Sequence, residues 1–235
     1  MLFISPPFGN YLKLPNTISI NGSFTIEPRT GIFTQVLKTL RYSREHHGWI
    51  NKIGFRNKGI DWALKNIPQD EVISIGIMKK EDIDIFYNKI PENRNIEINI
   101  SCPNVEKNYD SIDLSKFLSD KRKWCILKLS PKTSFEKIDY YYNQGFRQFH
   151  CCNTIPIKEG GLSGKTIQPY TIKLTKYIQD NCKNSTIISG GGIKTLDDYY
   201  NYKKNGASHC SISTLCFSPI SFLKFYKDYL FSNLG

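Results

Sequence analysis

Two amides, a hydroxyl and a thiol are gathered in one short segment of the chain: Asn99, Ser101, Cys102 and Asn104. Isoleucines alternate with polar residues over 96–100, which is the pattern of a strand. Pro103 then stops ladder pairing because it has no N–H to donate. The amides can donate and accept hydrogen bonds, and the thiol can act as acid or base. The set suits a flat, amide-rich ligand such as a pyrimidine ring; the alternative is a polar turn with an inert, buried cysteine.

Two further features could carry chemistry. Lys128 stands inside the apolar run 125–129, where a charge needs a partner unless the side chain turns outward between helices. A glycine triplet over 190–192 precedes a segment, 193–195, that predicts the start of a helix. Backbone N–H groups of glycines can approach a phosphate closely, and a helix N-terminus favours the anion. A lone glycine triplet is otherwise most often a turn.

The elements that must position these residues alternate in type. Eight apolar, β-branched runs are predicted as strands: 2–5, 17–22, 72–77, 96–101, 124–130, 146–153, 186–190 and 208–214. Amphipathic patterns such as 81–89 and 171–181 predict helices between them. Eight βα units predict a (β/α)₈ TIM barrel, an α/β fold, as a single domain over 1–235. The segment 6–16 holds three prolines and is short for a parallel crossover, so the first βα unit is predicted to be degenerate.

Five segments resemble the dihydroorotate dehydrogenase family in collinear order. Asn-Ile-Ser-Cys-Pro-Asn at 99–104 resembles the active-site loop of the soluble branch, in which a cysteine is the base. The other four are Gly48–Phe55, Lys128–Pro131, Asn153–Gly164 and the glycine run at 190–193 with 206–208 downstream. The resemblance extends roughly over residues 5–217. It implies an FMN-dependent oxidoreductase of pyrimidine biosynthesis that converts dihydroorotate to orotate.

The resemblance assigns roles residue by residue. Cys102 would remove a proton from C5 of the substrate while a hydride leaves C6 for the flavin, which requires a lowered thiol pKa. Lys128 would lie near the flavin and stabilise negative charge there. The implied substrate-binding residues are Asn51, Gly54, Asn99, Asn104, Asn153 and Thr154. The implied cofactor-binding residues are Lys128, Asn99, Gly161, Gly164, Gly191, Gly192 and Thr214, and no metal is expected.

One departure from the family pattern concerns the end of the second strand. The soluble enzymes carry a lysine there, near flavin and substrate carboxylate, whereas Asn21 or Gly22 occupies the position in this chain. Either Lys13 or Lys52 substitutes from nearby, or carboxylate recognition is altered. A charge-assisted hydrogen bond contributes on the order of 1.5–3 kcal/mol. The missing lysine therefore puts the substrate in question more than the flavin.

Composition bounds the remaining possibilities. The chain has 235 residues, a net charge of +11 and seven scattered cysteines without a Cys-x-x-Cys pair. Neither a disulfide framework nor a zinc site is predicted, and the absence of a long apolar run or signal sequence predicts a cytosolic protein with no membrane association. The basic residues are dispersed, so nucleic-acid binding is not favoured.

Two alternative functions stay open: a dihydrouridine synthase-like enzyme acting on tRNA, and a degenerate flavin-binding protein. We expect a homodimer, and the electron acceptor is left open between fumarate and NAD through a partner subunit.

Overall fold

Eight parallel strands close into a barrel in this protein. The computed structural model describes residues 1–100, 112–151 and 153–232. The barrel strands, in chain order, are β1 (Leu2–Ile4), β2 (Thr17–Phe24), β5 (Val72–Gly76), β6 (Ile96–Asn99), β7 (Cys125–Leu129), β8 (Gln148–Cys151), β11 (Thr186–Gly190) and β12 (His209–Ile212). Around the ring their order is β1-β12-β11-β8-β7-β6-β5-β2, and each neighbouring pair is parallel. The predicted TIM barrel is therefore confirmed.

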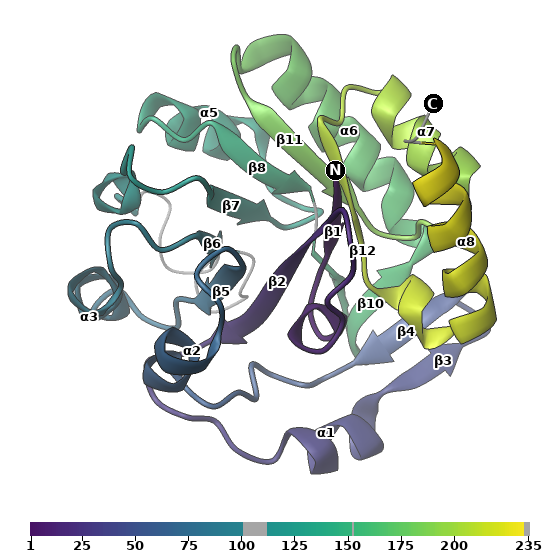
Figure 1. Ribbon diagram of the computed structural model, residues 1–235, viewed down its shortest axis with the longest axis horizontal. Helices are drawn as coiled ribbons and strands as arrows, with labels where there is room; N and C mark the ends of the chain where they lie inside the picture. Colours follow the sequence, from purple (N-terminus) through teal and green to yellow (C-terminus); the bar gives the residue numbers. More distant parts are fainter. Residues whose placement is uncertain (101–111, 152, 233–235) are drawn as a thin grey trace.

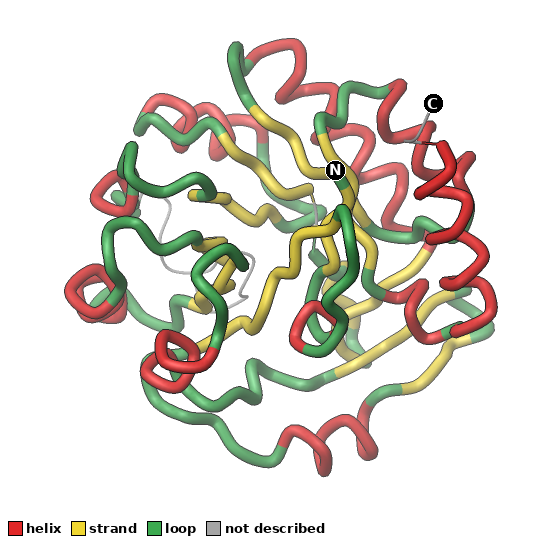
Figure 2. The backbone as a smooth tube through the Cα atoms, viewed as in Figure 1, coloured by secondary structure: helices red, strands yellow, loops and turns green. Residues whose placement is uncertain are grey.

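Helices surround the strand ring, as Figures 1 and 2 show. They are α1 (Ile32–Thr39), α2 (Ile60–Asn66), α3 (Asp82–Lys89), α5 (Phe135–Asn143), α6 (Gln168–Asn181), α7 (Leu196–Lys204) and α8 (Pro219–Ser232). The first βα unit is degenerate as predicted, since the short 3₁₀ turn η1 (Phe8–Asn10) is the one helical element between β1 and β2, a fully described stretch. The predicted strands at 96–101, 124–130, 146–153 and 208–214 are each shorter in the structure.

The barrel interior changes from apolar to polar along the strand direction. One buried cluster fills the interior nearer to the amino ends of the strands: Phe3, Ile20, Val72, Trp124, Ile126 and Ile188. Side chains two positions apart on a strand point to the same face. Two residues beyond five of these positions stand Ser5, Gly22, Ser74, Lys128 and Gly190. The apolar cluster therefore supports a layer of polar and small residues at the carboxyl ends of the strands.

A second sheet, which was not predicted, lies at this end of the barrel. Its order is β3-β4-β10-β9, formed by β3 (Arg41–Ser43), β4 (Gly48–Asn51), β9 (Ile155–Ile157) and β10 (Gly160–Gly164). β4 and β10 pair antiparallel, which joins the segment after β2 to the segment after β8 (Figure 1). The ring of Trp49 packs on that of Phe217, with centroids 4.5 Å apart, and thereby ties the sheet to the turn after β12.

Candidate active site

A cavity of about 90 Å³ opens at the carboxyl ends of the strands. Its lining comes from β7, β8, β10, β11 and β12, from the turns that follow them and from the loop after β1: Ser5, Pro6, Lys128, His150, Asn153, Thr154, Ser163, Gly164, Ile167, Gly190, Gly191, Gly192, Ile193, Ser211, Ile212, Ser213 and Thr214. Seven of the predicted site residues are among them. Asn51, Gly54, Asn99 and Gly161 are not in this lining.

The glycine turn after β11 is fixed from behind by two helices. Thr171 of α6 donates to the carbonyl of Gly190 at 2.9 Å, and Tyr202 of α7 donates to that of Gly191 at 2.6 Å. Gln168 donates to the carbonyl of Gly192 at 3.1 Å. Three successive carbonyls are thus bound on the helix side. The turn is consequently held in one conformation along the wall of the cavity.

Close backbone packing explains why the turn needs glycine. Gly192 has φ +73°, and a Cβ atom there would lie 2.6 Å from the Cα of Lys165 and 2.8 Å from the carbonyl oxygen of Gly164. Gly164 itself has φ +131° and lies against Gly48 of β4. The two glycine segments therefore meet where side chains cannot fit. Such a side-chain-free backbone cradle, in a cavity that Thr214 also lines, fits a phosphate group.

The N-terminus of α7, which was predicted to assist a phosphate, has a side-chain cap of its own. α7 begins after Thr195 as predicted, with a capping box in which Thr195 and Asp198 bind each other's backbone. The Asp198 carboxylate also accepts from the N–H of Lys194 at 2.9 Å. The Asp198 side chain thus places a negative charge at this helix N-terminus, where it opposes a second anion, and the glycine turn is the candidate anion-binding element.

Lys128 has a buried partner, as its position in an apolar strand requires. Its Nζ atom lies 3.3 Å from Oε1 of Glu97, whose side chain is fully buried. The second carboxylate oxygen lies 2.5 Å from Nδ1 of His150, which is 2% exposed. Burial alone would raise the pKa of Glu97, but the charge of Lys128 and the contacts with His150 lower it to about 2. The carboxylate is therefore ionised, and Lys128 has a neutralising anion inside the barrel.

His150 is the neutral member of this cluster. Burial lowers the pKa of its imidazole more than the neighbouring Glu97 raises it. Because Glu97 is ionised, the proton of the neutral ring resides on Nδ1 and is donated to the carboxylate. The imidazole also lines the cavity beside Lys128.

A chain of hydrogen bonds links the predicted amides to this cluster. Asn153 donates to Asn99 at 3.4 Å, and Asn99 donates to the Ser23 hydroxyl at 2.9 Å. The Ser23 and Ser74 hydroxyls are 2.9 Å apart, and Ser74 donates to Glu97 at 2.8 Å. Asn99 and Asn153, predicted from separate motifs, thus lie in one polar network across β6 and β8.

The other predicted substrate residues lie in the second sheet and its surroundings. Asn51 pairs with Gly161 in the β4–β10 ladder, and its side chain accepts from the N–H of Ile53 at 3.4 Å. A Cβ atom on Gly161 would lie 2.6 Å from the hydroxyl of Thr154, so this pair is in close contact. Gly54 is exposed in the loop beyond β4. Cys102 and Asn104 lie outside the described residues.

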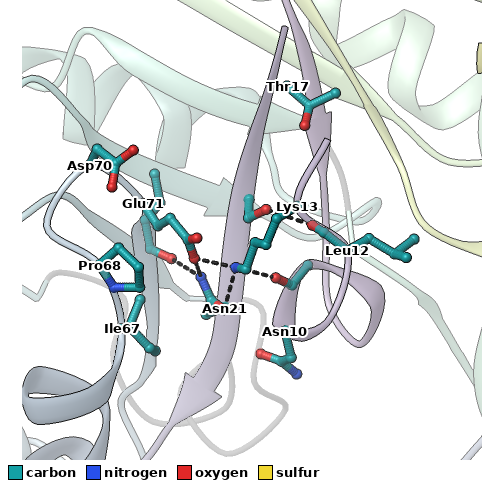
Figure 3. A network of polar contacts seen from close by, with 12 residues as sticks. Asn10, Leu12, Lys13, Thr17, Asn21, Ile67, Pro68, Asp70 and Glu71 are labelled. Atoms are coloured by element: carbon teal, nitrogen blue, oxygen red, sulfur yellow. Dashed lines mark hydrogen bonds and ion pairs between the residues drawn. The ribbon is translucent and has the colours of Figure 1, made fainter. Parts of the chain in front are cut away.

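The suggestion that Lys13 replaces the missing lysine is wrong. Its ammonium pairs with Glu71, just before β5, and donates to the side-chain oxygen of Asn21 at 3.3 Å (Figure 3). Glu71 in turn accepts from Asn21 at 2.7 Å. Asn21 follows Ile20 of the interior cluster, so its side chain points to the outer face of β2. This network therefore binds Lys13 on the outer face of the barrel, away from the cavity. Lys52 is exposed, with its aliphatic stem against Gly160.

Comparison with known proteins shows the family of this chain. A sequence profile described as dihydroorotate dehydrogenase matches residues 10–229. The chain belongs to the dihydroorotate dehydrogenase family. It is therefore a dihydroorotate dehydrogenase-like oxidoreductase, and the enzymes of this family are flavoproteins that generally depend on FMN.

Curated relatives are similar over most of the chain. The catalytic subunit of dihydroorotate dehydrogenase B (NAD(+)) from Thermotoga maritima is 24% identical over 277 aligned positions, covering 98% of both chains. The corresponding subunit from Malacoplasma penetrans is 29% identical over 76% of this chain and 70% of its own. The ligand-free dihydroorotate dehydrogenase of Eimeria tenella superposes with a TM-score of 0.72 at 17% identity, over 97% of this chain and 82% of that one. This last likeness concerns the fold.

The sequence analysis missed three residues of the buried cluster around Lys128, namely Glu97, His150 and Ser74. The signal was present, since Glu97 and His150, like Lys128, are ionisable residues inside apolar runs. Their contact with one another could be seen only from the strand register, in which Lys128 aligns with both Asn99 of β6 and His150 of β8.

Among the described residues, no helix is long and apolar enough to cross a membrane.

Proposed function

We propose that this protein oxidises dihydroorotate to orotate with FMN as its cofactor. The observation that carries the proposal is one cavity lined both by the fixed turn at Gly191 and Gly192 and by Lys128 and Asn153. A phosphate-binding backbone, a cation and a hydrogen-bonding amide are the groups that a flavin and a pyrimidine need. Family membership and the named activity of the relatives support the same assignment.

We assign the flavin to the strand ends between β7 and β12. Gly164, Gly191, Gly192 and Thr214 would hold its phosphate, and Lys128 would lie at its ring with Asn99 nearby. Gly161 would act indirectly, through its contact with Thr154. When bound, FMN supplies the hydride acceptor.

The chain's own groups would bind and orient the substrate. Asn51, Asn99, Asn104 and Asn153 offer amides to the alternating N–H and C=O groups of the pyrimidine edge. Thr154 and the backbone at Gly54 complete the proposed contacts. The positive charge of Lys128 favours negative charge in the cavity. Removal of the proton from C5 is assigned to Cys102 on the basis of its sequence motif.

The absorbance spectrum of the purified protein tests the cofactor. A yellow protein that releases free FMN on denaturation is the expected result. Anaerobic addition of dihydroorotate, without RNA, should then bleach the flavin. A protein that binds no flavin, or flavin that dihydroorotate leaves oxidised, would refute the proposal.

Substitution of Cys102 tests the assignment of the base. Cys102→Ala should keep FMN bound while slowing flavin reduction by roughly 10²–10⁴, the usual contribution of general acid–base catalysis. Cys102→Ser should fall between the wild type and the alanine variant. Wild-type reduction rates in Cys102→Ala would exclude the thiol as base.

The electron acceptor is proposed from the relatives. Several are named as catalytic subunits of the NAD(+) type, which supports NAD⁺ reached through a partner subunit. After anaerobic reduction, reoxidation of the flavin by fumarate should then be slow. Reoxidation by NAD⁺ should also be slow until such a subunit is added. Rapid reoxidation by fumarate alone would overturn this part.

A single domain over 1–235, a homodimer and a cytosolic location stay predictions.

A further inference from the structure

His150 and Lys128 contact the same buried carboxylate, that of Glu97. Glu97 offers two carboxylate oxygens, and the imidazole N–H takes one of them at 2.5 Å. The other oxygen is shared by the Ser74 hydroxyl at 2.8 Å and by Nζ of Lys128 at the longer distance of 3.3 Å. The carboxylate therefore binds its neutral donors closely and the ammonium loosely.

The loose contact leaves Lys128 available to a ligand. An ammonium group carries three N–H donors, and Lys128, which lines the cavity, uses one of them on Glu97. Without the imidazole donor, Oε2 of Glu97 would be a buried acceptor lacking that partner, which is costly. Of the two remaining donors to Glu97, the Ser74 hydroxyl has a single proton, which Oε1 already accepts, so the Lys128 ammonium is the one with further N–H groups to replace the lost hydrogen bond. It would then bind both oxygens and withdraw from the cavity.

We propose that His150 is a positioning residue: by occupying one oxygen of Glu97, it keeps the Lys128 ammonium directed to an anionic or electron-rich ligand in the cavity. This inference rests on the proposed function for the identity of that ligand, FMN. It concerns the contacts of this chain alone, so that its geometric consequence can be measured without flavin.

Two substitutions separate the positioning role from packing. His150→Leu removes the donor and keeps an apolar side chain, whereas His150→Asn retains an N–H donor at the position of Nδ1. His150→Leu should weaken FMN binding, followed by quenching of flavin fluorescence, by roughly tenfold or more, the size of a hydrogen bond to a charged group. His150→Asn should bind FMN within roughly threefold of the wild type.

A double variant gives the decisive comparison. Glu97→Gln in the His150→Leu background removes the anion that captures Lys128, so FMN affinity should return toward the wild-type value. A purely structural role predicts the opposite, because two disrupted buried positions destabilise more than one. Ser189→Ala, which removes a buried hydroxyl bonded to Thr175 at 2.7 Å on the outer side of β11, is the matched control and should leave FMN affinity unchanged.

The ligand-free crystal structure of His150→Leu supplies a readout independent of flavin. Nζ of Lys128 should lie within about 3 Å of both Glu97 oxygens. An ammonium still bound to one oxygen, or a double variant that binds FMN no better than His150→Leu, would overturn the inference. Wild-type protein that binds no FMN would instead refute the proposed function, while the Lys128 geometry would still decide the role of His150.

Discussion

The Tyr202 hydroxyl donates a 2.6 Å hydrogen bond to the carbonyl oxygen of Gly191. Tyr202 is 1% exposed and reaches from α7 to the back of the glycine turn. A helix on the outside of the barrel therefore helps to fix the backbone that faces the cavity.

Tyr202→Phe tests this support. The substitution keeps the ring and removes the hydroxyl, which contacts the Gly191 carbonyl at 2.6 Å and the Gly190 carbonyl at 3.4 Å. FMN affinity should therefore fall roughly two- to tenfold, given the 0.5–1.5 kcal/mol of a typical hydrogen bond. Isothermal titration of the apoprotein with FMN measures the change. Tyr200→Phe, on an exposed position of the same helix, is the control and should bind FMN normally. Equal affinities in the two variants would show that the turn is held without Tyr202.

Gly192→Ala tests the backbone cradle. Positive φ costs a non-glycine residue about 1–2 kcal/mol, and the added Cβ would also collide with the backbone of Lys165 and Gly164. We expect a lower melting temperature and loss of bound FMN. Gly31→Ala is the matched control, because Gly31 has φ +85° with nothing within 4 Å of an added Cβ. It should lose some stability and retain its flavin.

Stability should fall on acidification in two ranges. The folded-state pKa of His150 is lowered from 6.5, so the unfolded chain binds a proton that the folded protein refuses, and stability declines as the pH falls below about 6.5. Glu97, lowered from 4.5 to about 2, adds a second decline between those values. Urea unfolding from pH 7 to pH 3 measures both.

Comparison with variants isolates these two groups from other titrating residues such as His209, whose pKa burial lowers to about 4. His150→Asn should flatten the pH dependence of the free energy of unfolding above pH 5. Glu97→Gln should flatten the same dependence below pH 4.5. A variant with the wild-type pH dependence would mean that its residue does not contribute.

Recognition of the substrate carboxylate should be weak. Gly22 supplies no lysine, Lys13 is bound to Glu71, and Lys52 is exposed. We expect flavin reduction by dihydrouracil within roughly tenfold of that by dihydroorotate, since none of these three described positions offers the carboxylate a charge-assisted hydrogen bond. Stopped-flow absorbance measures both rates. A strong preference for dihydroorotate that is lost in Lys52→Ala would show that Lys52 turns inward, and one that survives would point to another group.

Much of the barrel could be predicted because its strands are continuous apolar runs with helical patterns between them. The site motifs at Asn99, Lys128, Asn153 and Gly191 all fall at strand ends, which is where a TIM barrel forms its site. The second sheet escaped prediction because strands such as Arg41–Ser43 and Ile155–Ile157 are too short to show a period.

Long-range partners account for the other failures. Lys13 lies near β2 in sequence, but Glu71, which precedes β5, determines where its ammonium is bound. Likewise, nothing within the run around Glu97 reveals that His150 and Lys128 share its carboxylate. Such choices follow from strand register and burial, which act between segments distant in the chain.

The β4–β10 ladder has a consequence for the order of ligand exchange. β4 leads into the proposed substrate loop at Asn51, whereas β10 ends at Gly164 beside the proposed phosphate turn. A movement of β4 that released the proposed substrate would also displace β10, because the two strands are hydrogen-bonded to each other. We therefore expect release of the product and release of the cofactor to be coupled through the second sheet. Changes in the length of either hairpin should alter both exit rates together.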